Sequence, residues 1–319
     1  GSDTDDYTYE ALKLFLLGAI SRAFKPGCKF EVMLCLVGGQ GAGKSSFFRL
    51  LAVNDDWFSD DLKKLDDENV YRKMQGHWII EMSEMIATAN AKSIEEIKSF
   101  LSRQKETYKI PYETHPADRK RQCVFGGSSN TLDFLPLDRT GNRRFVPVMV
   151  YPERAEVHIL ADEQASREYI NQMWAEAMEI YRSGNFRLRF SPAMNDYLKA
   201  HQKDFMPEDT KAGQILDYLE RYSGSIVCSK QLYKEALGHD YDEPKQWELR
   251  EINDIMNNAV TGWRAFSNPR YFPEPYRRQK GWERIRNDNE PDNSMDGFQE
   301  IPTEEMEQLG LPEEWLKQK

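Results

Sequence analysis

The sequence lacks long hydrophobic runs. Its longest apolar runs, residues 32–37 and 145–150, fall far short of the roughly 20 residues that a helix needs to cross a bilayer. A membrane-spanning segment is therefore excluded, and we expect no membrane partner. Gly1 and Ser2 are typical of the remnant of a cleaved tag, so we expect the natural chain to begin upstream.

Cysteine is also scarce. The 319 residues contain four cysteines, and no two of them form a C-x-x-C pair. This spacing argues against a disulfide framework and against a zinc site. We expect buried thiols in a reducing compartment, and hence a cytoplasmic protein.

An excess of positive charge is missing too, since the formal net charge is −10. The negative charge is unevenly distributed along the chain, because residues 287–319 hold ten Asp/Glu against two Lys, a net −8. Residues 1–286 therefore carry only −2, which leaves room for basic patches that bind nucleic acid. We interpret residues 287–319 as an acidic tail.

A glycine-rich motif stands near the start of the chain. Gly38, Gly43, Lys44 and Ser45 satisfy G-x-x-x-x-G-K-[ST], directly after the apolar run 32–37 and before a helix-like stretch. Such a strand–loop–helix segment wraps a triphosphate in backbone N–H groups, with the lysine at the β/γ-phosphates and the hydroxyl on magnesium. We therefore predict ATP and Mg²⁺ as ligands. The predicted nucleotide-binding residues are Gly38, Gly39, Gln40, Gly41, Ala42, Gly43, Lys44, Ser45 and Ser46.

Acidic residues follow the next apolar strand. Residues 78–80 form a short apolar run that ends in Glu81, with Glu84 three residues later. An ATPase of this kind needs one carboxylate at the metal and another that polarises the attacking water. We assign Glu81 to the metal site beside Ser45. Glu84 is either the partner base or an outward-facing helix residue.

Two further polar motifs complete the order that such an enzyme requires. A strand in "CVFGGSSN" ends at Asn130, and "TGNRRF" places Arg143 and Arg144 before another apolar strand. Charge that develops on the γ-phosphate is commonly met by an arginine, often from a neighbouring subunit. The arginines could also be ordinary surface charges.

The segment between the acidic strand and Asn130 is locally basic. Residues 92–121 hold eight Lys/Arg against five Asp/Glu. This stretch is either a phosphate-contacting region or a solvated loop.

The second half of the chain is mainly helical by pattern. An amphipathic helix is predicted over residues 163–183, and three shorter helices near 214–222, 229–237 and 247–257. They precede a wing-like stretch in which residues 270–286 hold six Lys/Arg against two Asp/Glu, interleaved with aromatic residues that either bind DNA or pack. We predict an N-terminal helix (1–25), a phosphate-loop ATPase core of α/β class with a parallel sheet flanked by helices (26–185), a small helical or winged-helix domain (186–286) and the acidic tail (287–319).

Several motifs in fixed order carry a family resemblance. The series "GGQGAGKSSFFRLLA", "WIIEMSEM", "RQCVFGGSSN", "LDRTGNRRFVPV" and "MWAEAMEIY" resembles the virulence-associated protein E family of phages, prophages and pathogenicity islands. The resemblance spans roughly residues 7–286. It implies a superfamily 3 helicase-like AAA+ ATPase that acts in mobile-element DNA replication. One departure is the serine pair before Asn130, where the family more often has threonines.

The resemblance also implies roles for residues. Lys44 and Ser45 would hold triphosphate and magnesium, Glu81 would be the acidic-motif carboxylate, and Asn130 would be the polar sensor that orients water. Arg144, with Arg143 as its rival, would be a finger that acts across a subunit interface, which implies a homo-oligomeric ring such as a hexamer. A DNA-contacting hairpin would bind single-stranded DNA. Its candidate contacts are Lys105, Lys109, Arg119, Lys120 and Arg121.

Two functions stay open at this point. The first is an ATP-driven DNA helicase or translocase. The second is a nonmotor AAA+ initiator, loader or regulator that uses ATP as a switch and does not unwind DNA.

Overall fold

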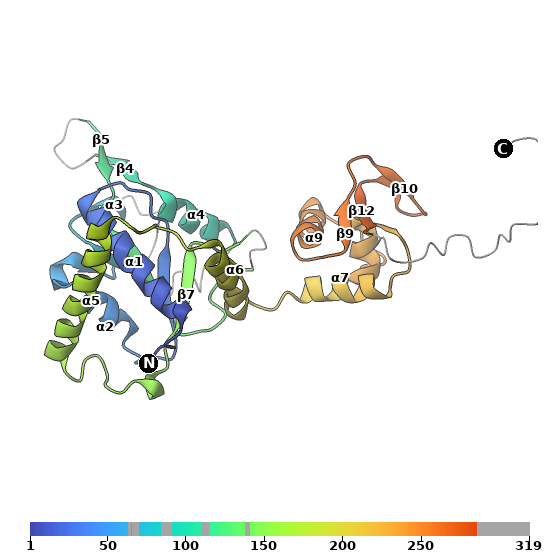
Figure 1. Ribbon diagram of the computed structural model, residues 1–319. Coiled ribbons are helices and arrows are strands. Elements are labelled where there is room, and N and C mark those ends of the chain that lie inside the picture. Colours follow the sequence, from blue (N-terminus) through green and yellow to red (C-terminus); the bar gives the residue numbers. More distant parts are fainter. Residues whose placement is uncertain (63–64, 66–69, 84–90, 110–114, 138–140, 286–319) are drawn as a thin grey trace, which may run out of the picture. The chain divides into compact units, whose positions relative to one another are not determined.

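The computed structural model describes residues 1–285 except 63–64, 66–69, 84–90, 110–114 and 138–140 (Figure 1). The chain forms two compact units, Gly1–Thr210 and Lys211–Lys319. Among the described helices, none is both long and apolar enough to cross a membrane.

Unit 1 is built on a parallel sheet. Its five strands lie in the order β2 (Phe58–Ser59), β3 (Ile79–Ser83), β6 (Val124–Ser129), β1 (Met33–Val37) and β7 (Phe145–Met149). Every neighbouring pair is parallel. All five strands therefore end at the same edge of the sheet.

Helices cover both faces of this sheet, as the α/β prediction requires. Leu34 and Leu36 of β1 belong to a core shared with α1 (Asp6–Phe24), α2 (Lys44–Leu51) and α5 (Glu163–Ser183). Met33, Cys35 and Val37 alternate with them and pack into a second core that includes α4 (Ala91–Ser102). The two-residue alternation of a strand explains why one apolar run serves both cores. The remaining short helices of unit 1 are η1 (Asp55–Trp57), α3 (Val70–Lys73), η2 (Pro152–Arg154), α6 (Pro192–His201) and η3 (Gln202–Phe205).

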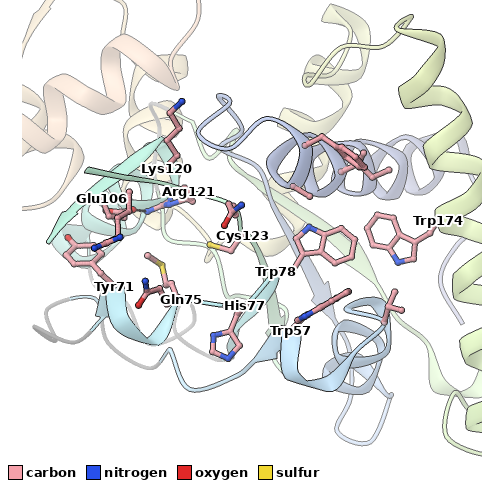
Figure 2. A pocket seen from close by; sticks show the side chains of 18 of the residues that line it. Trp57, Tyr71, Gln75, His77, Trp78, Glu106, Lys120, Arg121, Cys123 and Trp174 are labelled. Atoms are coloured by element: carbon pink, nitrogen blue, oxygen red, sulfur yellow. Dashed lines mark hydrogen bonds and ion pairs between the residues drawn. The ribbon is translucent and has the colours of Figure 1, made fainter. Parts of the chain in front are cut away.

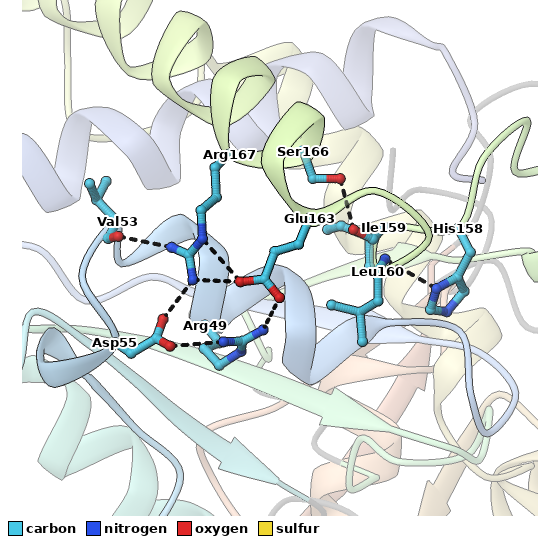
Figure 3. A network of polar contacts seen from close by, with 9 residues as sticks. All are labelled: Arg49, Val53, Asp55, His158, Ile159, Leu160, Glu163, Ser166 and Arg167. Atoms are coloured by element: carbon cyan, nitrogen blue, oxygen red, sulfur yellow. Dashed lines mark hydrogen bonds and ion pairs between the residues drawn. The ribbon is translucent and has the colours of Figure 1, made fainter.

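A ring of alternating charges ties α2 to α5 (Figure 3). Arg49 pairs with Asp55 at 2.8 Å and with Glu163 at 3.0 Å, and Arg167 pairs with the same two carboxylates at 3.0 and 2.8 Å. Hydrogen bonds from Arg167 and Arg49 lower the pKa of both Asp55 and Glu163. The ring fixes the helix that follows the glycine-rich loop against the long helix α5.

Unit 1 extends further than the predicted boundary at residue 185. The Gln202 amide donates hydrogen bonds to the carbonyls of Asn142 and Phe145, at 2.8 and 2.6 Å. Phe205 is buried and its ring contacts that of Phe134. These contacts hold α6 and η3 to the sheet, so the units divide after Thr210.

Unit 2 combines helices with a small antiparallel sheet. Strand order in the sheet is β8-β12-β9, and a separate hairpin pairs β10 with β11. One core joins Ile215, Leu232, Ile255 and Trp282. In chain order the elements are α7 (Thr210–Arg221), β8 (Ile226–Cys228), α8 (Ser229–Gln231), η4 (Leu232–Ala236), α9 (Gln246–Asn258), β9 (Trp263–Ala265), β10 (Arg270–Phe272), β11 (Arg277–Gln279) and β12 (Gly281–Arg284).

Candidate functional site

The glycine-rich loop, residues 38–43, joins the end of β1 to the start of α2. Gly41 and Gly43 have φ of 80° and 76°, in the left-handed region that favours glycine. A Cβ at Gly43 would also come within 2.8 Å of Ile159 Cγ2. No described side chain caps the helix at Gly43, so the N–H groups of the first turn of α2 point into the loop. Such a helix start favours an anionic ligand.

Lys44 joins this loop to the end of β6. Its ammonium donates to the carbonyls of Gly38 and Gly39, at 2.7 and 2.8 Å, and to Asn130 Oδ1 at 2.9 Å. Asn130 directly follows β6. The structure therefore brings together the two predicted residues, 86 positions apart in the chain.

Glu81 lies beside Ser45 at the same edge. The buried Glu81 carboxylate accepts hydrogen bonds at Oε1 from Ser45 Oγ, at 2.8 Å, and from Ser128 Oγ, at 2.5 Å. Its other oxygen, Oε2, is buried and has no hydrogen-bond partner among the described residues. Glu84, the other acidic candidate, lies outside the described residues.

Lys44, Ser45, Ser128 and Asn130 border a cavity of about 310 Å³, and the buried Glu81 lies behind Ser45 and Ser128. The cavity lining comprises Gln40, Gly41, Ala42, Gly43, Lys44, Ser45, Ser46, Ser83, Ser128 and Asn130. In the part of the chain that the structure describes, no three His, Cys, Asp or Glu residues cluster as metal ligands. A cation here would be held by one hydroxyl, one carboxylate and water, a ligand set that suits Mg²⁺.

Sequence reasoning missed Ser128. Parallel pairing sets Ser83 opposite Ser128 and Glu81 opposite Gly126, which brings the Ser128 hydroxyl to the Glu81 carboxylate. Ser128 could have been identified from its position in the sequence, because it lies two residues before Asn130 at the end of a strand that was already assigned to the site.

Arg143 and Arg144 lie at the opposite edge of the sheet. The backbone carbonyl of Arg144 accepts from the Met33 amide at 2.8 Å, where β1 begins. The glycine-rich loop follows the end of the same five-residue strand, about 16 Å away. Neither arginine therefore reaches the loop of its own chain.

The two arginines differ in exposure. Arg143 pairs with Glu31 at 3.0 Å and its side chain is 69% exposed, whereas that of Arg144 is 21% exposed. Arg144 Nε donates to Ser102 Oγ at 2.9 Å and lies 3.5 Å from Glu31. Burial raises the pKa of Glu31, but the Ser102 hydroxyl and the two guanidinium groups outweigh it, and this pKa lies below its ordinary value.

The predicted DNA-contacting residues fall on a hairpin that projects from unit 1 (Figure 1). Strands β4 (Lys105–Tyr108) and β5 (Ala117–Lys120) pair with Lys105 opposite Lys120. Lys105, Lys109 and Lys120 are exposed, and Lys105 forms an ion pair with Asp118. The Arg119 guanidinium lies over the Tyr108 ring, 5.3 Å from its centre.

Arg121 does not fit the predicted role as a DNA-contacting residue. Its side chain is 1% exposed, forms an ion pair with the buried Glu106, and donates to the Phe100 carbonyl at 2.6 Å. A positive charge so enclosed cannot meet a phosphate, so Arg121 anchors the hairpin to α4 instead. A count of local charge does not distinguish a buried cation from an exposed one.

A larger hollow of about 820 Å³ opens beside the hairpin (Figure 2). Three tryptophans gather on one side of this view: the Trp78 ring centroid lies 4.6 Å from that of Trp174 and 6.5 Å from that of Trp57. Arg119 and Lys120 form part of the same wall. Sequence reasoning did not find this hollow, because its aromatic residues come from separate segments.

Comparison with known proteins places the chain in a family. No curated protein matches it. An apo structure of the NrS-1 C-terminal region (305–718) has 14% identity and a TM-score of 0.47, over 88% of this chain and 72% of that one. The A form apo structure of the same region has 14% identity and a TM-score of 0.43, over 89% and 76%. The model of the virulence-associated protein E-like domain matches residues 1–207. The chain therefore belongs to the virulence-associated protein E-like family.

Proposed function

We propose that the chain hydrolyses ATP with magnesium at the cavity beside the glycine-rich loop and uses this reaction to move along and unwind DNA. One observation carries the proposal. The Ser45–Glu81 and Lys44–Asn130 hydrogen bonds bring the residues of the loop, the acidic strand and the sensor strand to one sheet edge.

The residues present fit both ligands. The open helix start at Gly43 and the Lys44 ammonium would hold the phosphates, and Ser45 with Glu81 would hold magnesium, directly or through water. The unpartnered Glu81 Oε2 supports a cation there, because a buried carboxylate oxygen without a partner is costly. Magnesium, when bound, would neutralise charge on the β- and γ-phosphates.

The protein's own groups divide the remaining work. Lys44 would exchange the carbonyls of Gly38 and Gly39 for phosphate oxygens. The Asn130 amide would orient the attacking water, and Glu81 would polarise the water bound to the metal. Glu84 remains the candidate for the base.

The arginines support an assembly of the AAA+ type. Because Arg143 and Arg144 lie at the far edge from their own loop, either could serve hydrolysis only in the site of a neighbouring chain. Strand order β2-β3-β6-β1-β7, with the arginines directly before β7, agrees with that architecture. A closed homo-oligomeric ring, such as a hexamer, satisfies this requirement for every site.

The hairpin and unit 2 support DNA as the partner. Exposed Lys105, Lys109 and Lys120 would meet phosphates of a single strand, as the family's association with mobile-element replication implies. Unit 2 has the element order of a winged helix, with the β10–β11 hairpin as its wing.

ATP hydrolysis measured with and without single-stranded DNA, beside strand displacement on a forked duplex, tests the proposal. We expect hydrolysis that DNA stimulates, together with displacement. Hydrolysis without displacement would favour the nonmotor AAA+ switch. A folded chain that neither binds nor hydrolyses ATP would overturn the proposal.

A further inference from the structure

We propose that unit 2 binds the phosphates of duplex DNA through its β10–β11 hairpin and the adjoining β9–β12 face, and that α9 stays outside the DNA groove. This inference deepens the proposed function and rests on its choice of DNA as the partner: the proposed function assigns a single strand to the β4–β5 hairpin of unit 1, and duplex DNA is here assigned to unit 2.

Charge within unit 2 is divided between its helices and its strands. Residues 211–258, which include α8 and α9, hold six Lys/Arg and nine Asp/Glu, a net −3. Residues 259–285, with strands β9 to β12, hold six Lys/Arg and two Asp/Glu, a net +4. Phosphates are therefore attracted to the strands and repelled by the helices.

Helix α9 is acidic. Its charged residues are Glu248, Glu251 and Asp254 against Arg250. Glu248 accepts from the Lys245 backbone N–H at the helix start, and Glu251 pairs with Lys211 at 2.6 Å. The approach of a helix with this charge to the phosphates that border a DNA groove would raise the free energy.

The hairpin is anchored on one face and open on the other. Phe272 is fully buried in a small core with Phe266 and Cys228. Tyr271 pairs with Arg278 across the strands, and strand alternation turns both away from that core. Tyr271 is 67% exposed and Arg278 is also exposed.

Two cations of the hairpin are available for a ligand. Arg278 and the exposed Lys280 form no ion pair with any residue in the described part of the chain. Two more cations lie beside them, because Arg264 and Arg270 share the single carboxylate of Glu283, at 2.8 and 2.7 Å. Arg264, Arg270 and Glu283 line a cavity of about 490 Å³ together with Arg284. The surface therefore keeps excess positive charge after its internal pairs are satisfied.

Duplex DNA fits this surface better than a single strand. A two-stranded ribbon has the width of the major groove, and cations on both strands of the ribbon can meet phosphates on both sides of it. Single-strand sites combine a basic groove with several stacked rings. On the described hairpin only Tyr271 offers an exposed ring, since Tyr276 is half-buried and bonds to Glu235 at 2.7 Å.

The double variant Arg278→Ala, Lys280→Ala tests the inference in the full chain. Binding of a labelled duplex, and of a single strand of equal length, is measured by fluorescence anisotropy over a series of salt concentrations. For the duplex, we expect the slope of log K against log salt to fall by about 1.8, or about 0.9 for each lost phosphate contact. The matched control, Lys245→Ala with Arg250→Ala at the start of α9, should keep the parental slope.

Each other outcome contradicts the inference. An unchanged duplex slope, an equal loss in the α9 control, or a loss seen only with the single strand would each overturn it. The variant Arg278→Gln, Lys280→Gln removes the same charges with less change in side-chain length, and it must show the same loss. ATP hydrolysis without DNA should be unchanged in both hairpin variants, and Lys44→Ala should keep the duplex slope. Failure of the proposed ATPase would therefore be distinguishable from failure of this site.

Discussion

The Ser45 hydroxyl donates a hydrogen bond of 2.8 Å to the Glu81 carboxylate, across 36 residues of sequence. Ser45 belongs to the first turn of α2 and Glu81 to β3. The same carboxylate oxygen also accepts from Ser128, which leaves Glu81 Oε2 directed at no described partner. A hydroxyl beside a carboxylate with one unpartnered oxygen is a ligand set that suits a magnesium ion with its water shell.

Lys44→Ala should abolish ATP hydrolysis. The variant removes the charge proposed to meet the β/γ-phosphates, and loss of one such group typically costs about 10²–10³-fold in rate. Phosphate release measures the effect, and circular dichroism verifies the fold. Lys13→Ala on α1, which removes a partly exposed lysine, should leave the rate unchanged. Normal turnover in folded Lys44→Ala protein would refute the assigned site.

Glu81→Gln should keep nucleotide binding and lose hydrolysis. The amide oxygen can still accept from Ser45 and Ser128, but it carries no charge for the metal. Ser128→Ala, which removes one of these two donors, should reduce the rate less. Binding of a fluorescent nucleotide and phosphate release separate the two effects. Lost binding with retained hydrolysis in Glu81→Gln would contradict this division of roles.

Arg144→Ala should bind ATP normally and hydrolyse it about 10³-fold more slowly, the low end for a missing finger. Mixing it with Lys44→Ala should restore part of the activity, because some interfaces then pair an intact loop with an intact arginine. Arg143→Ala, tested in the same way, examines the more exposed rival. A mixture that co-assembles but stays inactive for both arginines would exclude a finger supplied by a neighbour.

Arg121→Ala should lower the stability of the protein, whereas Lys120→Ala should weaken its binding to DNA. The first removes the buried cation of the Glu106 carboxylate, which keeps only the more exposed Arg103 at 3.7 Å, and should lower the free energy of unfolding by about 3 kcal/mol. The second removes an exposed charge, so stability should hold while the salt slope for single-stranded DNA falls by about 0.7. Thermal melts and anisotropy titrations measure the two effects. A stable Arg121→Ala chain with weakened DNA binding would show that Arg121 contacts DNA and does not anchor the hairpin.

His201 should make unit 1 less stable in mild acid. Burial lowers the pKa of its imidazole below the ordinary 6.5, although Asp204 opposes this effect. The folded state therefore favours the neutral ring, and its contribution is present above pH 6.5 and lost as pH falls through the lowered pKa. His201→Phe keeps a ring against Tyr7 and Phe205 and should flatten the fall in melting temperature between pH 7 and 5. An identical fall in both proteins would contradict this role.

Local patterns predicted much of unit 1, because strand, loop and helix follow each other directly in the chain. The apolar run 32–37 corresponds to Met33–Val37, and the glycines that follow it form the loop before α2. What the sequence could not predict depends on contacts between distant segments. Gln202 bonds to the sheet across about 60 residues, which moved the unit boundary. Ser128 reaches Glu81 only through strand register. Arg121 and its neighbour Lys120 look alike in sequence, yet Lys120 at the end of β5 is exposed and Arg121, the next residue, is buried.

The buried Arg121 has a mechanical consequence. Its guanidinium bonds to the Phe100 carbonyl in α4, its backbone N–H bonds to the Gln104 carbonyl, and its ion pair holds Glu106 of β4. Helix α4 and the β4–β5 hairpin are thus joined at the base of the hairpin, so we expect them to move together as one rigid body. A small rotation of α4 would move Lys109, which directly follows β4, further than it moves Arg121. Arg121 therefore contributes stiffness where α4 meets the hairpin, and not a charge that a ligand could reach.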